Sequence, residues 1–183
     1  MSVLFYKNCD AKLIFRTPKK NLFLKDFMET INHYTELIEK SLQMLGIEPE
    51  TSRCADPGQW LVYNGETEIY IDLWEQKEPN GWNYFQPEGY NLKVFQVLSP
   101  VCILPDESQL TAFYEDLLEN NLNMFFASFI VNKQENMLAL KFRRICNDLR
   151  VEDIIEAIES VGYYSELTAS VFTDKYGVQR IKL

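Results

Sequence analysis

Residues 105–162 read PDESQLTAFYEDLLENNLNMFFASFIVNKQENMLALKFRRICNDLRVEDIIEAIESVG, and the spacing of apolar residues changes twice within them. The spacing is helical at first, alternates over 125–131 and 137–145, and becomes helical again between Val151 and Gly162. A helix, a hairpin and a second helix with short connections indicate an α+β fold. In such a fold, helices pack on a mostly antiparallel sheet.

The preceding part of the chain predicts one helix and three strands. These elements are expected at 24–45, 59–63, 67–74 and 92–103. The apolar stripe of the helix fits packing on its own sheet or, as an alternative, a seam between two helices. Asn64-Gly65 favours a type I′ turn, which predicts that the first two strands form a hairpin. Ser99-Pro100 interrupts the third strand, because proline donates no ladder hydrogen bond.

Periodicity also predicts which side chains face the core. In strand 67–74, the buried face should carry Ile69, Ile71 and Leu73, and a solvated face Glu68, Tyr70 and Asp72. In the late hairpin, the core face should carry Leu138, Leu140 and Phe142. The stripe of the preceding helix consists of Leu110, Phe113, Tyr114, Leu117 and Leu118.

Several residues mark expected helix ends. Asp106 and Gln109 resemble a capping box, and the helix that follows should end near Asn120-Asn121. Arg150 stands where a serine or threonine cap is usual, so the start of the last helix is left open. Gly162 is expected to terminate that helix.

The whole chain, 1–183, is expected to form a single domain. Its core should span about 22–162. Two terminal hairpins are expected outside this core, one over 2–16 and one over 169–183.

The element order helix, three strands, helix, two strands, helix resembles that of the YbjN-like proteins and the type III secretion chaperones. The residues that carry the resemblance are the run 117–121 (LLENN) leading into a strand, Phe129-Ile130-Val131, and Asp148 before the final helix. The resemblance covers about four fifths of the chain. It implies a small, acidic, cytoplasmic bacterial protein, often a dimer, that binds other proteins.

The formal charge is −9, from 27 acidic and 18 basic residues, which argues against binding to a phosphate backbone. Such acidity favours solubility, or a basic partner. No apolar run reaches the length of a membrane span. The four cysteines show no C-x-x-C spacing and are expected to be reduced thiols, so we expect a cytoplasmic protein with no membrane partner. They are Cys9, Cys54, Cys102 and Cys146.

The sequence offers little for catalysis. His33, the only histidine, lies off the apolar stripe of its helix and is expected at the surface. Cys146 is expected to pack as a small hydrophobe in the second strand of the late hairpin. A carboxylate pair could act without histidine, and the candidates are Asp72, Glu75, Glu78 and Glu88. No phosphate-binding glycine motif or metal-ligand spacing occurs, so we expect no enzyme, no cofactor and no metal site.

The loop over 75–90 is the strongest candidate for a binding site. It is long for a compact domain and rich in aromatic residues, which supply much of the energy at protein interfaces. The candidate partner-binding residues are Trp82, Tyr84, Phe85 and Tyr90. The alternative is that these side chains cover an edge of the sheet.

Together these features predict a non-enzymatic protein-interaction module that binds a protein segment through a sheet edge or a helix face, as a homodimer. One alternative is an acidic inhibitor or immunity-type protein that binds a basic toxin or enzyme. A second alternative is a small-molecule or glycan binder that uses the loop 75–90.

Overall fold

The computed structural model of the chain describes residues 24–76 and 92–181, with side chains described from Asn32 onward. The hairpin expected over 2–16 lies outside these ranges and stays a prediction. The predicted α+β class is confirmed, as is the order helix, three strands, helix, two strands, helix. A one-turn helix between the first helix and the first strand is an addition that the sequence did not predict.

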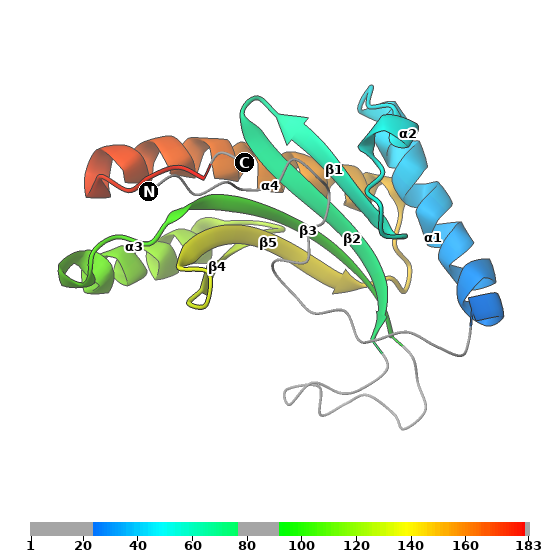
Figure 1. Cartoon of the computed structure of the whole chain (residues 1–183), viewed down its shortest axis with the longest axis horizontal. Helices are drawn as coiled ribbons and strands as arrows, with labels where there is room; N and C mark the ends of the chain where they lie inside the picture. The colour runs from blue at the N-terminus through cyan, green and yellow to red at the C-terminus, as the bar shows by residue number, and fades with distance from the viewer. Residues whose placement is uncertain (1–23, 77–91, 182–183) are drawn as a thin grey trace.

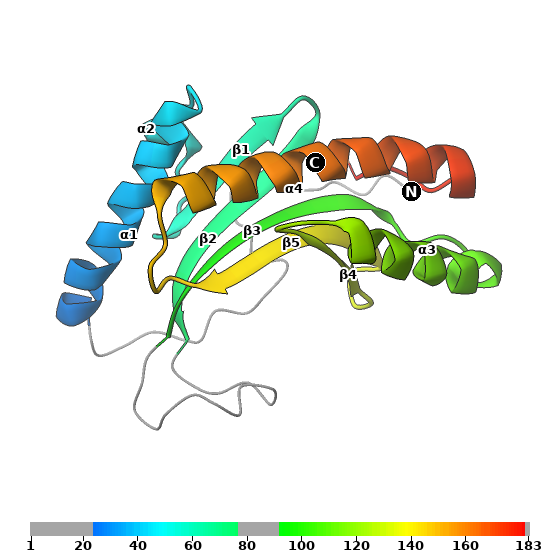
Figure 2. The same cartoon turned by 180° about the vertical axis from the view of Figure 1, so that it is seen from behind.

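All five strands form one antiparallel sheet in the order β1-β2-β3-β5-β4. The strands are β1 (Gln59–Asn64), β2 (Thr67–Gln76), β3 (Leu92–Ile103), β4 (Ser128–Asn132) and β5 (Met137–Ile145). The helices are α1 (Leu24–Met44), α2 (Pro49–Ser52), α3 (Leu110–Asn123) and α4 (Val151–Tyr176). In Figures 1 and 2, α4 extends across one face of the sheet, with α1 near its start and α3 beside β4.

The core lies between α4 and the sheet face beneath it. The predicted alternation is confirmed in β2, where Ile71 is fully buried. In β5, the predicted core residues Leu138 and Leu140 are fully buried and Phe142 is partly buried against the same core, but Met137 and Ala139 on the other face are buried as well. Ile38 and Leu42 of α1 are buried in the same cluster, which supports the intramolecular interpretation of the α1 stripe. The Ser41 hydroxyl lies 2.8 Å from the Leu37 oxygen of its own helix and 3.3 Å from the Val151 oxygen, so it can donate to either, and α1 contacts the start of α4 here.

The last helix differs most from expectation. Helix α4 continues through Gly162 to Tyr176, and the hairpin expected over 169–183 is absent from the described residues up to 181. Gly162 does not stop the helix because its role is close packing: a Cβ there would lie 2.8 Å from Ile69 Cδ1. Gly177, with φ of 64°, provides the left-handed residue that ends the helix.

After Gly177 the chain turns back onto the sheet. The Ile103 N–H donates to the Gln179 oxygen (2.9 Å), and the Ile181 N–H donates to the Val101 oxygen (3.2 Å). These bonds occupy the edge of β3 beyond the end of its pairing with β2 at Leu98. The residues expected as a second hairpin strand therefore pair with β3 instead.

The helix starts also differ from the sequence prediction. Asp106 makes no side-chain cap, and a 3₁₀ turn over Glu107–Gln109 leads into α3. At α4, Asp153 accepts hydrogen bonds from the backbone N–H and the guanidinium of Arg150, so an arginine serves at the cap position. These bonds hold the pKa of Asp153 below its usual value. No helix in the described ranges is both long and apolar enough to cross a lipid bilayer.

Candidate functional site

The aromatic residues predicted for partner binding lie outside the described ranges, which end at Gln76 and resume at Leu92. The same holds for two of the candidate carboxylates. The residues concerned are Trp82, Tyr84, Phe85, Tyr90, Glu78 and Glu88. Their assignment to a binding site stays a prediction.

Asp72 belongs to a row of polar side chains on the sheet face opposite α4. It accepts hydrogen bonds from the amides of Gln59 and Gln96 (both 3.0 Å), and Arg143 donates to the oxygen of Gln96 (2.9 Å). Burial raises the pKa of Asp72 above 3.8, while the bonds from Gln96 and Gln59 and the charge of Arg143 oppose the rise. This face of β2 is therefore half-buried and hydrogen-bonded, where the sequence predicted a solvated face.

A carboxylate pair of Asp72 and Glu75 is not formed. The two residues are three positions apart in a strand, so their side chains point to opposite faces of the sheet. Asp72 is held by amides and an arginine across the four strands β1, β2, β3 and β5. The arrangement fits a structural row better than an acid and a base on either side of a substrate.

The histidine and the cysteine considered for catalysis lie where the sequence predicted them. His33 is exposed, as predicted, with its ring 5.2 Å from that of Tyr34. Cys146 is fully buried and lies just after β5, where burial raises the pKa of its thiol to about 12, far above the range of a reactive thiolate. In the described part of the chain, no three His, Cys, Asp or Glu side chains are grouped so as to hold a metal ion.

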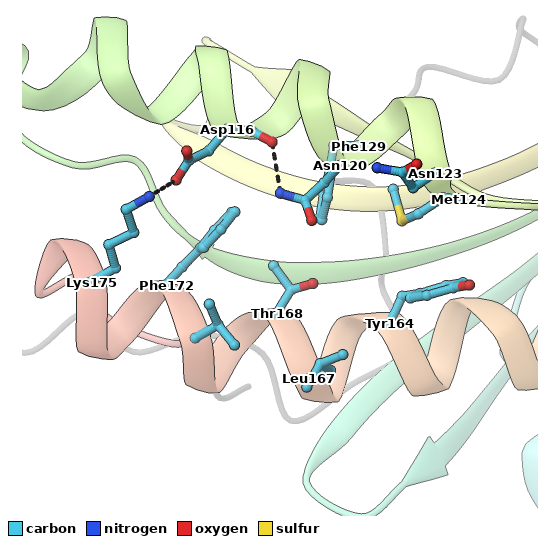
Figure 3. A pocket seen from close by; sticks show the side chains of 11 residues that line it. Asp116, Asn120, Asn123, Met124, Phe129, Tyr164, Leu167, Thr168, Phe172 and Lys175 are labelled. Carbon is cyan, nitrogen blue, oxygen red and sulfur yellow. Dashed lines mark hydrogen bonds and ion pairs between the residues drawn. The ribbon is translucent and has the colours of Figure 1, made fainter.

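A groove lies between α3 and α4, and Figure 3 shows the two helices as its walls. The helices are joined at one end of the groove, where the ring of Phe113 packs 5.1 Å from Phe172 and 5.2 Å from Tyr176. There Lys175 forms an ion pair with Asp116, which also accepts the hydroxyl of Tyr176. The hydrogen bonds from Lys175 and Tyr176 hold the pKa of Asp116 below its usual value.

Beyond this junction the helices enclose a groove of about 310 Å³. The volume is roughly ten times that of a water molecule in the liquid, which is enough for a few side chains of a partner. The lining is apolar, with the residues Met124, Phe129, Leu167, Val171 and Phe172, and also carries Asn120, Asn123, Tyr164 and Thr168. These residues come from α3, the loop after it, β4 and α4 (Figure 3).

The outer face of α3, opposite the groove, is apolar as well. Leu118 and Leu122 are one turn apart and 70% and 84% exposed, and Phe125 and Phe126 after the helix are 75% and 50% exposed. The sequence placed Leu118 in a core-facing stripe, which is wrong. The sequence did contain a sign of this, because the predicted stripe is wider than one buried face and only Phe113 and Leu117 of it are buried.

The two helices that form the groove carry most of the net negative charge of the protein. Three acidic residues lie in α3 and six in α4, against one basic residue, Lys175. Asp116 already pairs with that lysine. Around the groove itself, Glu166 is paired with Arg180, and the exposed Glu119 and Asp174 add two carboxylates, so the surface there is net acidic.

One edge of the sheet, β4, is partly closed by a side chain. The Asn121 amide accepts from the Phe129 N–H (2.7 Å) and donates to the Phe129 oxygen at the long distance of 3.5 Å. An asparagine of α3 thus pairs with the edge strand as a neighbouring strand would. Helix α3 runs past this residue to Asn123, slightly beyond the predicted end.

No known protein family and no curated protein matches the chain in sequence. Among solved structures, the fold is similar to a chain in the structure of the HopA1–SchA chaperone–effector complex. The TM-score is 0.53 at 8% identity, over 78% of this chain and 97% of that chain. A chain in the ExsC–ExsE complex gives a TM-score of 0.49 at 11% identity, over 76% of this chain and 93% of that chain. The chaperone-like fold is therefore confirmed, whereas the resemblance to YbjN-like proteins stays a prediction.

Proposed function

We propose that the protein is a non-enzymatic, cytoplasmic protein-interaction module, related in function to the secretion chaperones and acting as a homodimer that binds a second protein. The observation that carries this proposal is the apolar surface on both sides of α3. Leu118 and Leu122 form its outer side, and the groove beside α4 forms its inner side. Exposed apolar patches and apolar grooves of this kind are typical of protein-binding sites.

The outer side of α3 fits a second copy of the same chain. Two leucines one helical turn apart form a short seam that a symmetry-related α3 can cover, with each copy offering the same patch. The flanking Glu115 and Glu119 are exposed and would lie at the rim of such a contact, where solvent and salt screen their repulsion. A dimer of this kind leaves the inner groove free for a different partner.

The proposal is tested by capture of a partner from the source cells with immobilised wild-type protein and the double variant Leu118→Glu/Leu122→Glu. A protein retained by the wild type is expected, and the double variant should retain less of it, because without the dimer two grooves no longer act together on one immobilised pair. Met44→Glu is the matched control, because Met44 is exposed to a similar degree (62%) but lies at the end of α1. Equal retention by all three would contradict a role for α3.

An acidic inhibitor or immunity-type protein is the second candidate, favoured by the concentration of acidic residues on α3 and α4. Its association rate with a basic target should fall steeply with salt, whereas contact through the leucines of α3 should depend on salt only weakly. A salt series on the captured partner separates the two. Binding of a glycan by the loop 75–90 remains a prediction on residues outside the described ranges.

A further inference from the structure

The α3/α4 groove offers chemistry that specifies its occupant. We propose that it binds an amphipathic helix of a partner protein, with apolar anchors on one face and lysines or arginines beside them. This inference rests on the proposed protein-binding function and adds the chemical class of the bound segment. Four features of the groove support it: its apolar floor, its lack of unpaired backbone, its hydrogen-bond acceptors and its charge.

The floor of the groove fits apolar side chains arranged along one line. On α4, the lining runs from Tyr164 to Lys175, three helical turns or roughly 17 Å. Leu167 and Val171 on this stretch are 48% and 47% exposed, so a partner can cover them. A helix of about three turns, with apolar residues three and four apart, matches this length.

A helix fits the groove better than an extended strand does. The walls are two helices, α3 and α4, whose backbone groups bond internally, so they offer no ladder to an incoming strand. An extended segment would bury its own N–H and C=O groups against Phe129 and Phe172 without partners. A helical segment satisfies these groups itself.

Some of the polar atoms that remain open in the groove are hydrogen-bond acceptors. The Asn120 side-chain nitrogen donates to the backbone oxygen of Asp116 (2.7 Å), and that of Asn123 donates to Glu119 (3.3 Å). Each of these bonds uses one of the two amide hydrogens, so the amide oxygens of both asparagines stay open as acceptors, and one N–H of each stays open as a donor. Lysine and arginine side chains, which only donate, can bond to these amide oxygens.

Thr168 adds a further polar group inside the groove. Its side chain points between the helices in Figure 3, and the residue is only 8% exposed. Its hydroxyl makes no hydrogen bond to another residue in the described parts of the chain. A hydroxyl at this position can accept a hydrogen bond from the bound segment or donate one to it.

The charge around the groove is net negative, because Lys175, the basic residue of the lining, is already paired with Asp116. Glu119 is three residues after Asp116 and four before Asn123, which places it along the same wall. Asp174 follows Val171 by three residues on the opposite wall, and both acidic residues are exposed. Basic residues beside the apolar anchors of a partner helix would meet these carboxylates.

A second copy of the chain does not suit the groove. The exposed apolar face that it could insert is the outer face of α3, which is flanked by Glu115 and Glu119. Insertion would bring acidic residues against an acidic groove. It would also make a head-to-tail contact, which extends to further copies rather than closing into a dimer.

The test uses a labelled synthetic peptide of three to four helical turns, with leucines at helical spacing and lysines at the flanking positions, measured by fluorescence anisotropy. Two matched peptides carry glutamine or glutamate in place of every lysine. We expect the lysine peptide to bind roughly tenfold tighter than the glutamine peptide at low salt. The glutamate peptide should not bind measurably, and the advantage of lysine should shrink as salt is raised.

Val171→Asp separates binding in the groove from general charge attraction. It adds acidity but places a carboxylate on the apolar lining, so we expect the affinity for the lysine peptide to fall roughly tenfold or more. Leu122→Asp is the matched control on the outer face of α3 and should leave that affinity unchanged. Urea unfolding of both variants establishes that they remain folded.

Three outcomes would overturn the inference: equal affinity for all three peptides, tighter binding by Val171→Asp, or loss of self-association in Val171→Asp. The last outcome would assign the groove to a second copy. The proposed function is tested separately through Leu118 and Leu122, which lie outside the groove lining. If the peptide test fails, the inference about the groove is wrong, but the capture experiment still decides the proposed protein-binding function.

Discussion

At the scale of single residues, Asn121 connects a helix to a sheet edge. Its amide bonds the backbone of Phe129 at both N–H and C=O, so the amide takes the position of a sixth strand at this point. Asn121→Ala should lower the free energy of unfolding by about 1 kcal/mol, because the buried-edge N–H of Phe129 loses its acceptor.

The matched control for this change is Asn120→Ala. Asn120 precedes it on the same helix but is exposed and bonds only to the backbone of α3, so its replacement should change stability by less than about 0.5 kcal/mol. Both substitutions share the same gain in helix propensity, and the difference between them in urea unfolding isolates the clamp on β4. Equal effects of the two changes would contradict the role of Asn121.

Asp72 predicts an unusual pH dependence. Its pKa is raised from 3.8 by burial, so the folded state binds the proton more strongly than the unfolded state does. Its contribution to stability is therefore fully present below 3.8 and is lost as the pH rises through the raised folded pKa. Carboxylates with a lowered folded pKa, such as Asp116 and Asp153, have the opposite effect on stability: their contribution is present above the unfolded pKa and is lost as the pH falls.

Asp72→Asn removes this titration. The free energy of unfolding of the variant relative to the wild type should increase as the pH is raised from about 4 to about 7. Urea midpoints at several pH values measure the difference directly. A difference that stays constant, or that changes in favour of the wild type, would mean that Gln59, Gln96 and Arg143 stabilise the carboxylate more than burial penalises it.

At the scale of elements, Gly162 allows the β1–β2 hairpin to pack directly on α4. A Cβ at this position would lie 2.8 Å from Ile69 Cδ1 and 3.0 Å from Asn64 Nδ2. Gly162→Ala should therefore destabilise the protein by about 1 kcal/mol, because the strain of overpacking exceeds the gain in helix propensity. Ser170→Ala, at an exposed position of the same helix, should be neutral or slightly stabilising. If Gly162→Ala were more stable than the wild type, α4 and the β1–β2 hairpin would have moved apart enough to accommodate the methyl group without strain.

At the scale of the whole molecule, the proposed dimer can be tested by sedimentation equilibrium across a wide concentration range. We expect the wild type to self-associate and Leu122→Glu to remain monomeric with an unchanged urea midpoint, because Leu122 is 84% exposed. Ile38→Glu should instead unfold the protein, since Ile38 of α1 is fully buried in the core. A wild type that is monomeric at all concentrations would exclude the dimer and leave α3 to a different partner.

The sequence by itself determined the elements whose signals are local. The Asn64-Gly65 signal placed the first hairpin correctly, but not its turn type: Asn64 ends β1 opposite Thr67, so the turn residues are Gly65 and Glu66, of which only Gly65 has a positive φ. Periodicity placed Ile71, Leu138 and Leu140 in the core, because it depends on neighbouring residues. The element order that follows from these signals was enough to predict the chaperone-like fold. The local pattern also identified His33 as a surface residue and Cys146 as a buried one.

Only the tertiary structure decided which apolar residues stay exposed and where the last helix ends. Leu117 and Leu118 are equivalent as sequence letters, but one packs on the core and the other faces solvent, since the direction in which α3 packs depends on distant segments. In the sequence, Gly162 suggests the end of a helix. In the structure it lies within the helix and leaves room for the side chain of Ile69, which is 93 residues earlier. The groove has the same origin, because α3 and α4 meet through contacts between residues about 60 positions apart.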